Sequence, residues 1–119
     1  MTDDLAAADE RLNLLLDLRR YREAEAFARE CLARDPEWAD GHLQLARALS
    51  GLGRLKHALR AAEIGVGKRP DSVWAHLVLG YVHSGLRRHK DALAAADEAL
   101  RLDPLSAEAA LLRAEVLSA

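Results

Sequence analysis

Apolar residues along this 119-residue chain recur three or four positions apart, in successive stretches separated by short polar breaks. This spacing places the apolar side chains on one face of an α-helix. The breaks contain glycines such as Gly53 and Gly85, or a proline, and both residue types end helices. The pattern predicts an all-α chain without strands, with helices near residues 3–19, 21–34, 37–51, 54–68, 72–85, 88–102 and 106–118.

The three prolines of the chain, Pro36, Pro70 and Pro104, lie 34 residues apart. When the sequence is shifted over itself by this period, without gaps, similar residues align. The aligned columns include Ala24, Ala58 and Ala92; Ala28, Ala62 and Ala96; Leu18, Leu52 and Leu86; and Cys31, Gly65 and Ala99. Small side chains on one helical face let two helix backbones approach closely. The period therefore predicts three helical hairpins, with Cys31 as a small buried residue.

The repeated segments resemble the tetratricopeptide repeat. The residues that carry the resemblance are Leu79-Gly80 with Ala92 and Pro104, and Tyr21-Arg-Glu-Ala24 with Pro36. It implies a right-handed α-solenoid of three helix-turn-helix repeats plus a C-terminal helix, as a single domain over residues 1–119. The repeats span about 5–38, 39–72 and 73–106, and the last helix about 106–118.

The first repeat departs from the family pattern most. Ala8, His42 and His76 stand where the family favours Trp, and Leu12 stands where it favours Gly. Repeat one is therefore expected to be an atypical, capping unit. The chain ends after what would be the first helix of a fourth repeat, so this helix either caps the array or belongs to a longer repeat protein.

A second face of each first helix recurs and is the candidate binding surface. In proteins similar to this one, that face lines a concave groove that holds peptides or helices. Its residues are Asp9, Asn13, Asp40, Leu43, Gln44, Arg47, Trp74, Leu77, Val78, Tyr81, Leu111 and Leu112. The stripe changes from acidic to apolar along the array, which predicts a partner with apolar anchors and a basic flank. The alternative is that Trp74 and Tyr81 only pack between neighbouring helices.

Some family members use these same faces to clamp a terminal carboxylate with Lys, Asn and Arg, as the heat-shock-chaperone adaptors do. Only Asn13 matches that clamp here, because Asp9, Trp74 and Val78 stand where cations would be required. This argues against the clamp subtype. Small chaperones of bacterial secretion systems shield a partner helix in an apolar groove, and the chain resembles them in that respect only. We therefore predict a non-catalytic scaffold or chaperone-like adaptor.

Cations recur at the turn between the paired helices and would align into a basic edge. They are Arg19, Arg20 and Arg22, then Arg54, Lys56 and His57, then Arg87, Arg88, His89 and Lys90. One interpretation is that the dipole at the carboxyl end of a helix favours these cations, which also keep the edge soluble. The alternative is a docking surface for nucleic acid or an acidic partner.

Charge and composition narrow the partners and the compartment. The 17 basic and 19 acidic residues give a net charge of −2, which disfavours nucleic acid and anionic membrane as partners. Cys31 is the single cysteine and cannot form an internal disulfide, so a cytoplasmic location is expected. No apolar run is long enough to predict a membrane span. Leu111, Leu112, Val116 and Leu117 make the last helix apolar on more than one side, which predicts self-association and an oligomerisation segment as another alternative.

The sequence contains no arrangement typical of an enzyme or a metal site. His76 and His83 lie seven residues apart and His42 would stack beneath His76, but no Cys or carboxylate is spaced to complete a tetrahedral set. Gly65-Val-Gly67-Lys68 lacks the spacing of a phosphate loop and follows no strand. No serine is paired with His and Asp in a convincing way. We expect no enzymatic activity, no cofactor and no metal.

Overall fold

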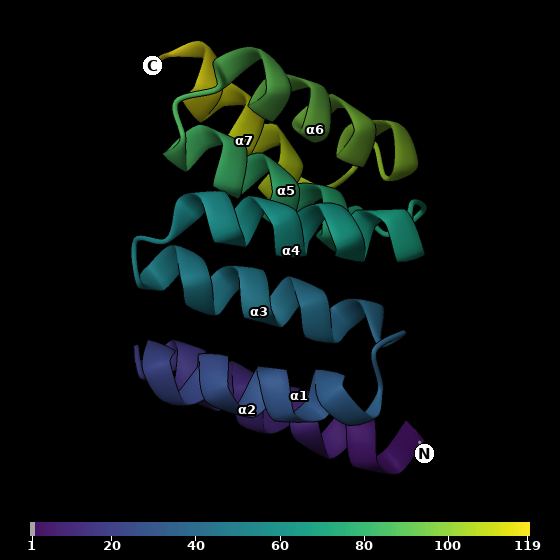
Figure 1. The fold of residues 1–119 in the computed structure, drawn as a ribbon. Coiled ribbons are helices and arrows are strands. Elements are labelled where there is room, and N and C mark those ends of the chain that lie inside the picture. The colour runs from purple at the N-terminus through teal and green to yellow at the C-terminus, as the bar shows by residue number, and fades with distance from the viewer. Residues whose placement is uncertain (1) are drawn as a thin grey trace.

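The computed structural model describes residues 2–119 and shows seven helices and no strand in that range. The helices are α1 (Thr2–Asp17), α2 (Tyr21–Arg34), α3 (Ala39–Gly51), α4 (Leu55–Lys68), α5 (Val73–Gly85), α6 (His89–Leu102) and α7 (Ala107–Leu117). Figure 1 shows them stacked from α1 and α2 at one end to α6 and α7 at the other, with successive helices running in opposite directions. The all-α solenoid predicted from the repeat is confirmed, and every predicted helix end lies within two residues of the observed one.

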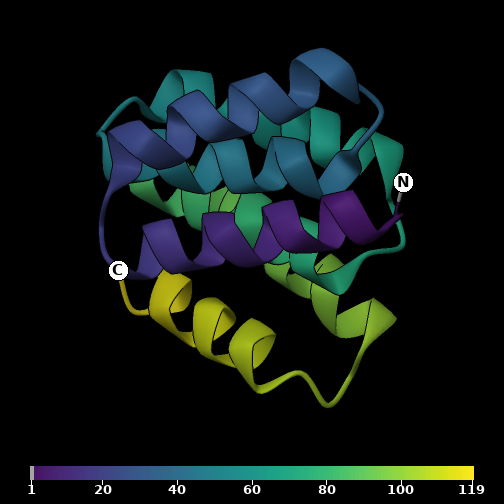
Figure 2. The same cartoon turned by 90° about the horizontal axis from the view of Figure 1, so that it is seen from below.

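The helices form two layers. Each of α1, α3, α5 and α7 contacts the next member of that series, so these helices make a continuous inner layer. The outer helices α2, α4 and α6 contact inner helices but not one another. Figure 2 looks along the stack and shows α1 and α7 on the side away from α2, although they lie at opposite ends of the stack in Figure 1. The four inner helices thus present one common face.

The aligned alanine columns form the centre of the stack. Ala24, Ala58 and Ala92 are fully buried, as are the alanines four residues after each of them. Methyl side chains at these positions allow the inner and outer helix of each repeat to pack closely. The burial predicted for Cys31 is wrong in degree, because its side chain is only half-buried. The side chain of Leu43 lies against Gly65. One repeat earlier in the sequence, Asp9 stands at the position that is equivalent to Leu43.

The turn inside each repeat has the same backbone conformation. Arg19, Gly53 and Arg87, each 34 residues from the next, have φ values of 59°, 78° and 60°. The amide that follows each of them donates to a carbonyl five residues before it, for example Arg88 N to His83 O at 2.9 Å. This is the Schellman helix end, in which the left-handed residue is usually glycine. Glycine occupies it only in repeat two, so arginine is strained at the other two turns.

Two histidines connect the start of an inner helix to the loop before it. His42 Nε2 lies 2.8 Å from the carbonyl oxygen of Pro36, and His76 Nε2 lies 2.7 Å from that of Pro70. A carbonyl can only accept, so Nε2 carries the hydrogen in both rings. The two histidines therefore fix the entry into α3 and α5, in the sequence column where the tetratricopeptide repeat pattern favours Trp.

Candidate functional site

A cavity of about 710 Å³ opens on the common face of the inner layer, and we call it the front groove. It is lined by residues from α1, α2, α3, α5 and α7. Eight of the twelve residues of the predicted binding stripe line it, namely Asp9, Asn13, Asp40, Gln44, Arg47, Trp74, Val78 and Tyr81. The fold therefore gathers these eight side chains, from three inner helices, around one volume.

The other four residues of the stripe lie elsewhere. Leu43, Leu77 and Leu112 are buried in the packing between helices and do not line the front groove, which corrects their assignment as groove residues. Leu43 packs against Gly65 of α4, and Leu112 packs against Gly80 of α5. One residue along a helix turns the side chain by about 100°, which is enough to move it from the open face to the core. Leu111 is exposed but lies outside the cavity.

Sequence reasoning missed five lining residues, namely Leu16, Tyr21, Ser50, Gly51 and Val82. Glu108 also lines the cavity, at the position of α7 that is equivalent to Asp40 and Trp74 in the repeat. Leu16, Ser50 and Val82 lie three or four residues beyond stripe members, so an extension of the stripe by one helical turn would have found them. Tyr21 begins α2, and its ring lies against Gly51 at the end of α3. No sequence periodicity indicates that contact, because it forms between two different repeats.

The end of the front groove near α1 contains a hydrogen-bonded polar network centred on Gln44. The Gln44 side chain is fully buried, and its Nε2 donates to Asp9 Oδ1 at 2.9 Å and to Asn13 Oδ1 at 2.8 Å. Arg47 Nη1 donates to Gln44 Oε1 at 2.9 Å and to Asn13 Oδ1 at 3.2 Å. Both hydrogens and the oxygen of the Gln44 amide are thus satisfied. The network connects the carboxylate of Asp9 to the guanidinium of Arg47 through two amides.

The other end of the front groove is apolar and aromatic. Trp74 and Val78 line the cavity and also pack against the core, whereas the Tyr81 side chain is 46% exposed. Burial raises the pKa of the Tyr81 phenol, and the carboxylates of Glu108 and Glu115 raise it further. The expectation that Trp74 and Tyr81 serve only as packing residues does not fit Tyr81, whose ring faces the open cavity.

The charges that line the front groove are predominantly negative. Asp9, Asp40 and Glu108 contribute three carboxylates, against the single guanidinium of Arg47. Oδ1 of Asp40 also lies 3.7 Å from Nη1 of Arg69, but Arg69 is outside the cavity. Cationic groups on a bound segment would be attracted to this surface, and a bound carboxylate would be repelled.

The predicted basic edge does follow the turns, but the helix dipole explains only part of it. Lys56 and His57 lie in the first turn of α4, and His89 and Lys90 begin α6. A cation is disfavoured at the amino end of a helix, so the dipole interpretation is wrong for these residues. Two arginines of the edge are paired, Arg20 with Glu23 at 2.6 Å and Arg54 with Glu25 at 3.4 Å.

The described residues form neither a metal-binding cluster nor a membrane-spanning helix. Among the described residues, no three His, Cys, Asp or Glu side chains gather where they could hold a metal ion. His42 and His76, which sequence spacing brought into consideration, are each bonded to a proline carbonyl. No helix within residues 2–119 combines the length and the apolar character that a membrane span requires.

Comparisons with known proteins give one consistent result. A family model described as a tetratricopeptide repeat (TPR) matches residues 43–105 and 77–118, and a second model of that description matches residues 10–37. No curated protein matches the sequence.

Solved structures resemble the fold closely at low sequence identity. The first TPR of Spaghetti (RPAP3) bound to the HSP90 peptide SRMEEVD has a TM-score of 0.86 and 18% identity, with 95% of this chain and 90% of that chain covered. The TPR domain of Arabidopsis OM64 has a TM-score of 0.86 and 21% identity, with 95% and 93% covered. A thermophilic TPR protein of Thermus thermophilus has a TM-score of 0.87 and 23% identity, with 95% and 64% covered.

Proposed function

The chain belongs to the tetratricopeptide repeat family, and from this premise we propose that it is a non-catalytic scaffold for protein interactions. Its front groove holds a peptide or helix of another protein, which inserts apolar side chains at the α5 end and places basic side chains at the acidic positions. The observation that supports this proposal most directly is one cavity of about 710 Å³ that combines Trp74, Val78 and Tyr81 with three carboxylates.

The apolar end would supply most of the binding free energy. Aromatic side chains bury a large apolar area and lose few rotamers on binding, and a few such residues usually dominate an interface. Tyr81 is exposed in the free protein and has apolar area to lose to a partner. Trp74 is already partly packed, so it offers a pre-positioned surface. We therefore place the anchor of the partner between these two rings.

The carboxylates would select the partner and orient it. Asp9 and Asp40 lie toward the α1 and α3 side and Glu108 lies on α7, so negative charge borders the aromatic end from two directions. The peptide bound by the Spaghetti domain, SRMEEVD, has three acidic residues among its last four. Such a terminus would meet like charge here, which costs binding free energy. We propose a basic, apolar segment instead, and the chaperone-like adaptor role remains part of this proposal.

The test compares groove variants with an edge variant. Proteins would first be captured from a lysate of the source organism. Overlapping synthetic peptides that cover their sequences would then be made, and the affinity of each peptide for the chain would be measured by fluorescence anisotropy. We expect Tyr81→Ala and Trp74→Ala to weaken the best peptide by about tenfold or more each, as anchor residues do. The Arg87→Ala, Arg88→Ala double variant serves as the control, because both arginines lie outside the front groove.

Circular dichroism must first show that each variant is as helical as the wild type, since Trp74 also contacts the core. Tyr81 is exposed and keeps the test valid if Trp74→Ala unfolds the chain. Binding that survives both groove variants, but disappears in high salt or in the double arginine variant, would transfer the function to the basic edge and to an acidic or nucleic-acid partner.

A second proposal concerns self-association through α7. Leu111 and Leu117 on this helix are 58% and 57% exposed, and Leu105 just before it is 91% exposed. We propose that a second copy of the chain covers this apolar surface, because exposed apolar patches mark interaction sites and terminal repeats usually have a polar outer face. Light scattering should show a dimer whose mass falls to that of a monomer in Leu111→Glu and Leu117→Glu. A wild-type mass that stays monomeric at high concentration contradicts self-association.

The cytoplasmic location stays a prediction.

A further inference from the structure

We propose that the chain has a second binding site, on its outer layer, for an acidic and apolar segment of another protein. The site is a cavity of about 390 Å³ between α2 and α4, and we call it the outer cleft. It shares no lining residue with the front groove. This inference therefore does not depend on the function proposed for that groove.

The outer cleft exists because neighbouring outer helices do not contact each other. Both α2 and α4 pack on α3, and α3 forms the floor of the space between them. Leu45 and Leu49 of α3 form this floor, and Leu32 and Ile64 form the two sides. Ile64 is 45% exposed, so the cleft has apolar surface that is open to a partner. Burial of such a surface is favourable at about 25 cal/mol per Å².

The charged and imidazole groups that line the outer cleft are basic. Arg29 lines it from α2, and His57 and Arg60 line it from α4, whereas no described carboxylate lines it. The nearest compensation is Glu25, whose Oε2 accepts from Arg29 Nε at 3.0 Å. Arg60 forms no salt bridge with any carboxylate of the described part of the chain. A guanidinium without a partner at the edge of an apolar cleft suits a carboxylate ligand.

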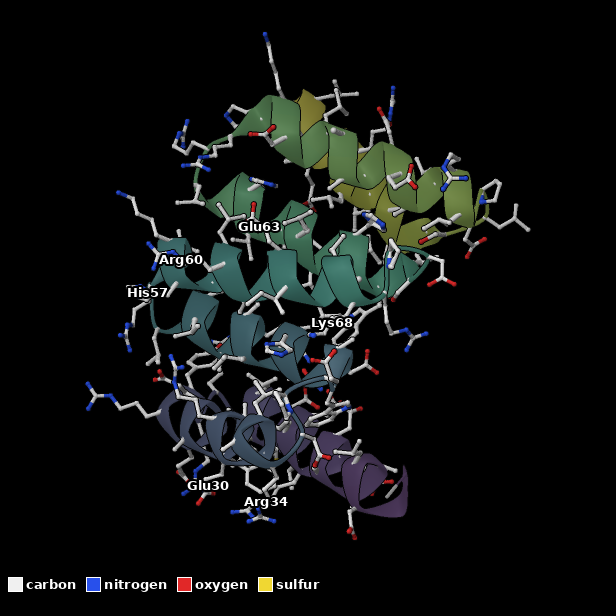
Figure 3. All side chains as sticks on the ribbon, turned by 45° about the vertical axis from the view of Figure 1, so that its right-hand side comes forward. Glu30, Arg34, His57, Arg60, Glu63 and Lys68 are labelled. Carbon is white, nitrogen blue, oxygen red and sulfur yellow. The ribbon has the colours of Figure 1, made fainter. Side chains whose placement is uncertain are left out.

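The labelled side chains of Figure 3 show how the charges are separated on the outer layer. His57 and Arg60 project from the same end of α4, whereas Glu63 projects from the side of α4 that faces away from α3. Glu30 and Arg34 project from the side of α2 that is remote from α3. These labelled acidic residues of the two outer helices thus point away from the outer cleft, and its basic residues remain uncompensated by them.

The next repeat provides an internal comparison, because the same positions recur 34 residues later. Arg29 corresponds to Glu63, His57 to Asp91 and Ile64 to Glu98. The solenoid therefore tolerates acidic residues at these positions, and the basic, apolar set at the outer cleft is not needed for folding. The helix dipole does not explain it either, because His57 lies in the first turn of α4. A ligand with the opposite charge accounts for both observations.

The two sites select opposite partners. The front groove is lined by three carboxylates and one guanidinium, and the outer cleft by two guanidinium groups and no described carboxylate. A segment that suits one site would meet like charge in the other. The scaffold could hold a basic segment on its inner layer and an acidic segment on its outer layer at the same time, since no residue is shared.

The experiment selects peptides from a random library displayed on phage against a bait whose front groove is disabled by Trp74→Ala and Tyr81→Ala. A second bait carries Arg60→Glu and Ile64→Glu in addition. Ile64→Glu introduces the residue type that the following repeat carries at Glu98. Both added changes are at exposed positions, and circular dichroism would verify that the two baits are as helical as the wild type. If Trp74→Ala lowers the helix content, both baits carry Tyr81→Ala alone. We expect the first bait to enrich peptides that combine Asp or Glu with Leu, Ile or Phe.

Synthetic copies of the enriched peptides would then be titrated by fluorescence anisotropy against the otherwise unmodified chain. We expect Arg60→Glu to weaken binding by about tenfold or more, because like charges in contact are strongly unfavourable. Arg88→Glu is the matched control, since Arg88 is exposed and lines neither site, and it should change the affinity by less than about twofold.

Three results would overturn the proposal. The first is that the two baits enrich the same peptides, or that neither enriches any. The second is an enriched set without an excess of acidic residues. The third is that light scattering shows a wild-type dimer that Arg60→Glu dissociates, which would make a second copy the occupant. None of these results tests the front groove, because both baits carry the same substitutions there and differ only at Arg60 and Ile64.

Discussion

Repeats two and three of this chain have the same backbone and opposite surfaces. Repeat two presents Asp40, Gln44 and Arg47 to the front groove, where repeat three presents Trp74, Val78 and Tyr81. On the outer layer, repeat two is instead the more apolar of the two repeats. There, repeat two contributes most of the apolar and basic outer cleft, whereas the same positions of repeat three include Asp91 and Glu98.

This difference shows which positions the solenoid constrains. The columns between inner and outer helices hold small residues in both repeats, for example Ala58 with Ala92 and Ala62 with Ala96, and all four are fully buried. Positions that face either open surface differ in charge and in polarity. Buried positions therefore carry the stability, including Gln44 beneath the front groove, and exposed positions are free to match partners. Exchanges of residues between the two repeats test this division, because the backbone context stays the same.

The largest effect is expected from Gln44→Val, which gives repeat two the residue of repeat three at Val78. The exchange removes a fully buried amide, so Asp9, Asn13 and Arg47 each lose a hydrogen-bond partner. We expect the free energy of unfolding to fall by about 1–3 kcal/mol, because half-buried groups, two of them charged, lose hydrogen bonds. Urea denaturation followed by circular dichroism measures it.

Gln44→Glu is the isosteric companion of that variant. It keeps the shape of the side chain but replaces Nε2, which donates both hydrogen bonds, with an oxygen that faces the acceptor oxygens of Asp9 and Asn13. We expect it to destabilise the chain at neutral pH at least as much as Gln44→Val. If both variants unfold at the urea concentration of the wild type, the polar network does not stabilise repeat two, and the groove surface is independent of folding even at a buried position.

An intermediate effect is expected from Gly65→Ala, which introduces the residue of repeat three at Ala99. A methyl group at Gly65 would lie 2.5 Å from Leu43 Cδ2 and 3.3 Å from the carbonyl oxygen of Ala39. Leu43 is fully buried and cannot move without repacking. Overpacking of this kind costs about 1–3 kcal/mol. The higher helix propensity of Ala offsets at most about 1 kcal/mol of that cost.

Gly67→Ala is the control for Gly65→Ala, because the same helix carries it and no atom lies within 4 Å of the added methyl group. Gly67→Ala should stabilise the chain by about 0.5–1 kcal/mol through helix propensity alone. Thermal unfolding of the two variants side by side separates packing from propensity. Equal melting temperatures would show that the interior column of repeat two has as much room as that of repeat three.

The smallest effect is expected from Arg87→Gly, which gives repeat three the glycine of repeat two at Gly53. Arg87 has φ of 60°, a left-handed conformation that is strained for residues with a Cβ atom. Glycine removes this strain, which stabilises the folded chain. It also raises the conformational entropy of the unfolded chain, which offsets part of the gain, so we expect a net stabilisation of about 0.5–1 kcal/mol. The reverse exchange, Gly53→Arg, should destabilise by a similar amount. A Gly53→Arg variant with an unchanged urea midpoint would refute the strain at this turn.

The helices and the repeat could be predicted from the sequence because both depend on spacing along the chain. Apolar periodicity and the positions of glycine and proline placed every helix end within two residues. The 34-residue period then indicated which small residues, such as Ala24 and Ala58, meet between helices. These are local properties, and each aligned column supports the others.

Only the tertiary structure decided which side chains share a site. Asp9 and Gln44 are 35 residues apart and meet because the stack places α1 beside α3. Leu43 and Gln44 are neighbours in sequence and both are buried, but one packs against Gly65 and the other faces the front groove. The outer cleft depends on the space between α2 and α4, which no sequence pattern describes. The direction of a side chain is set by the helix that packs against it, and this neighbour is fixed only when the solenoid has formed.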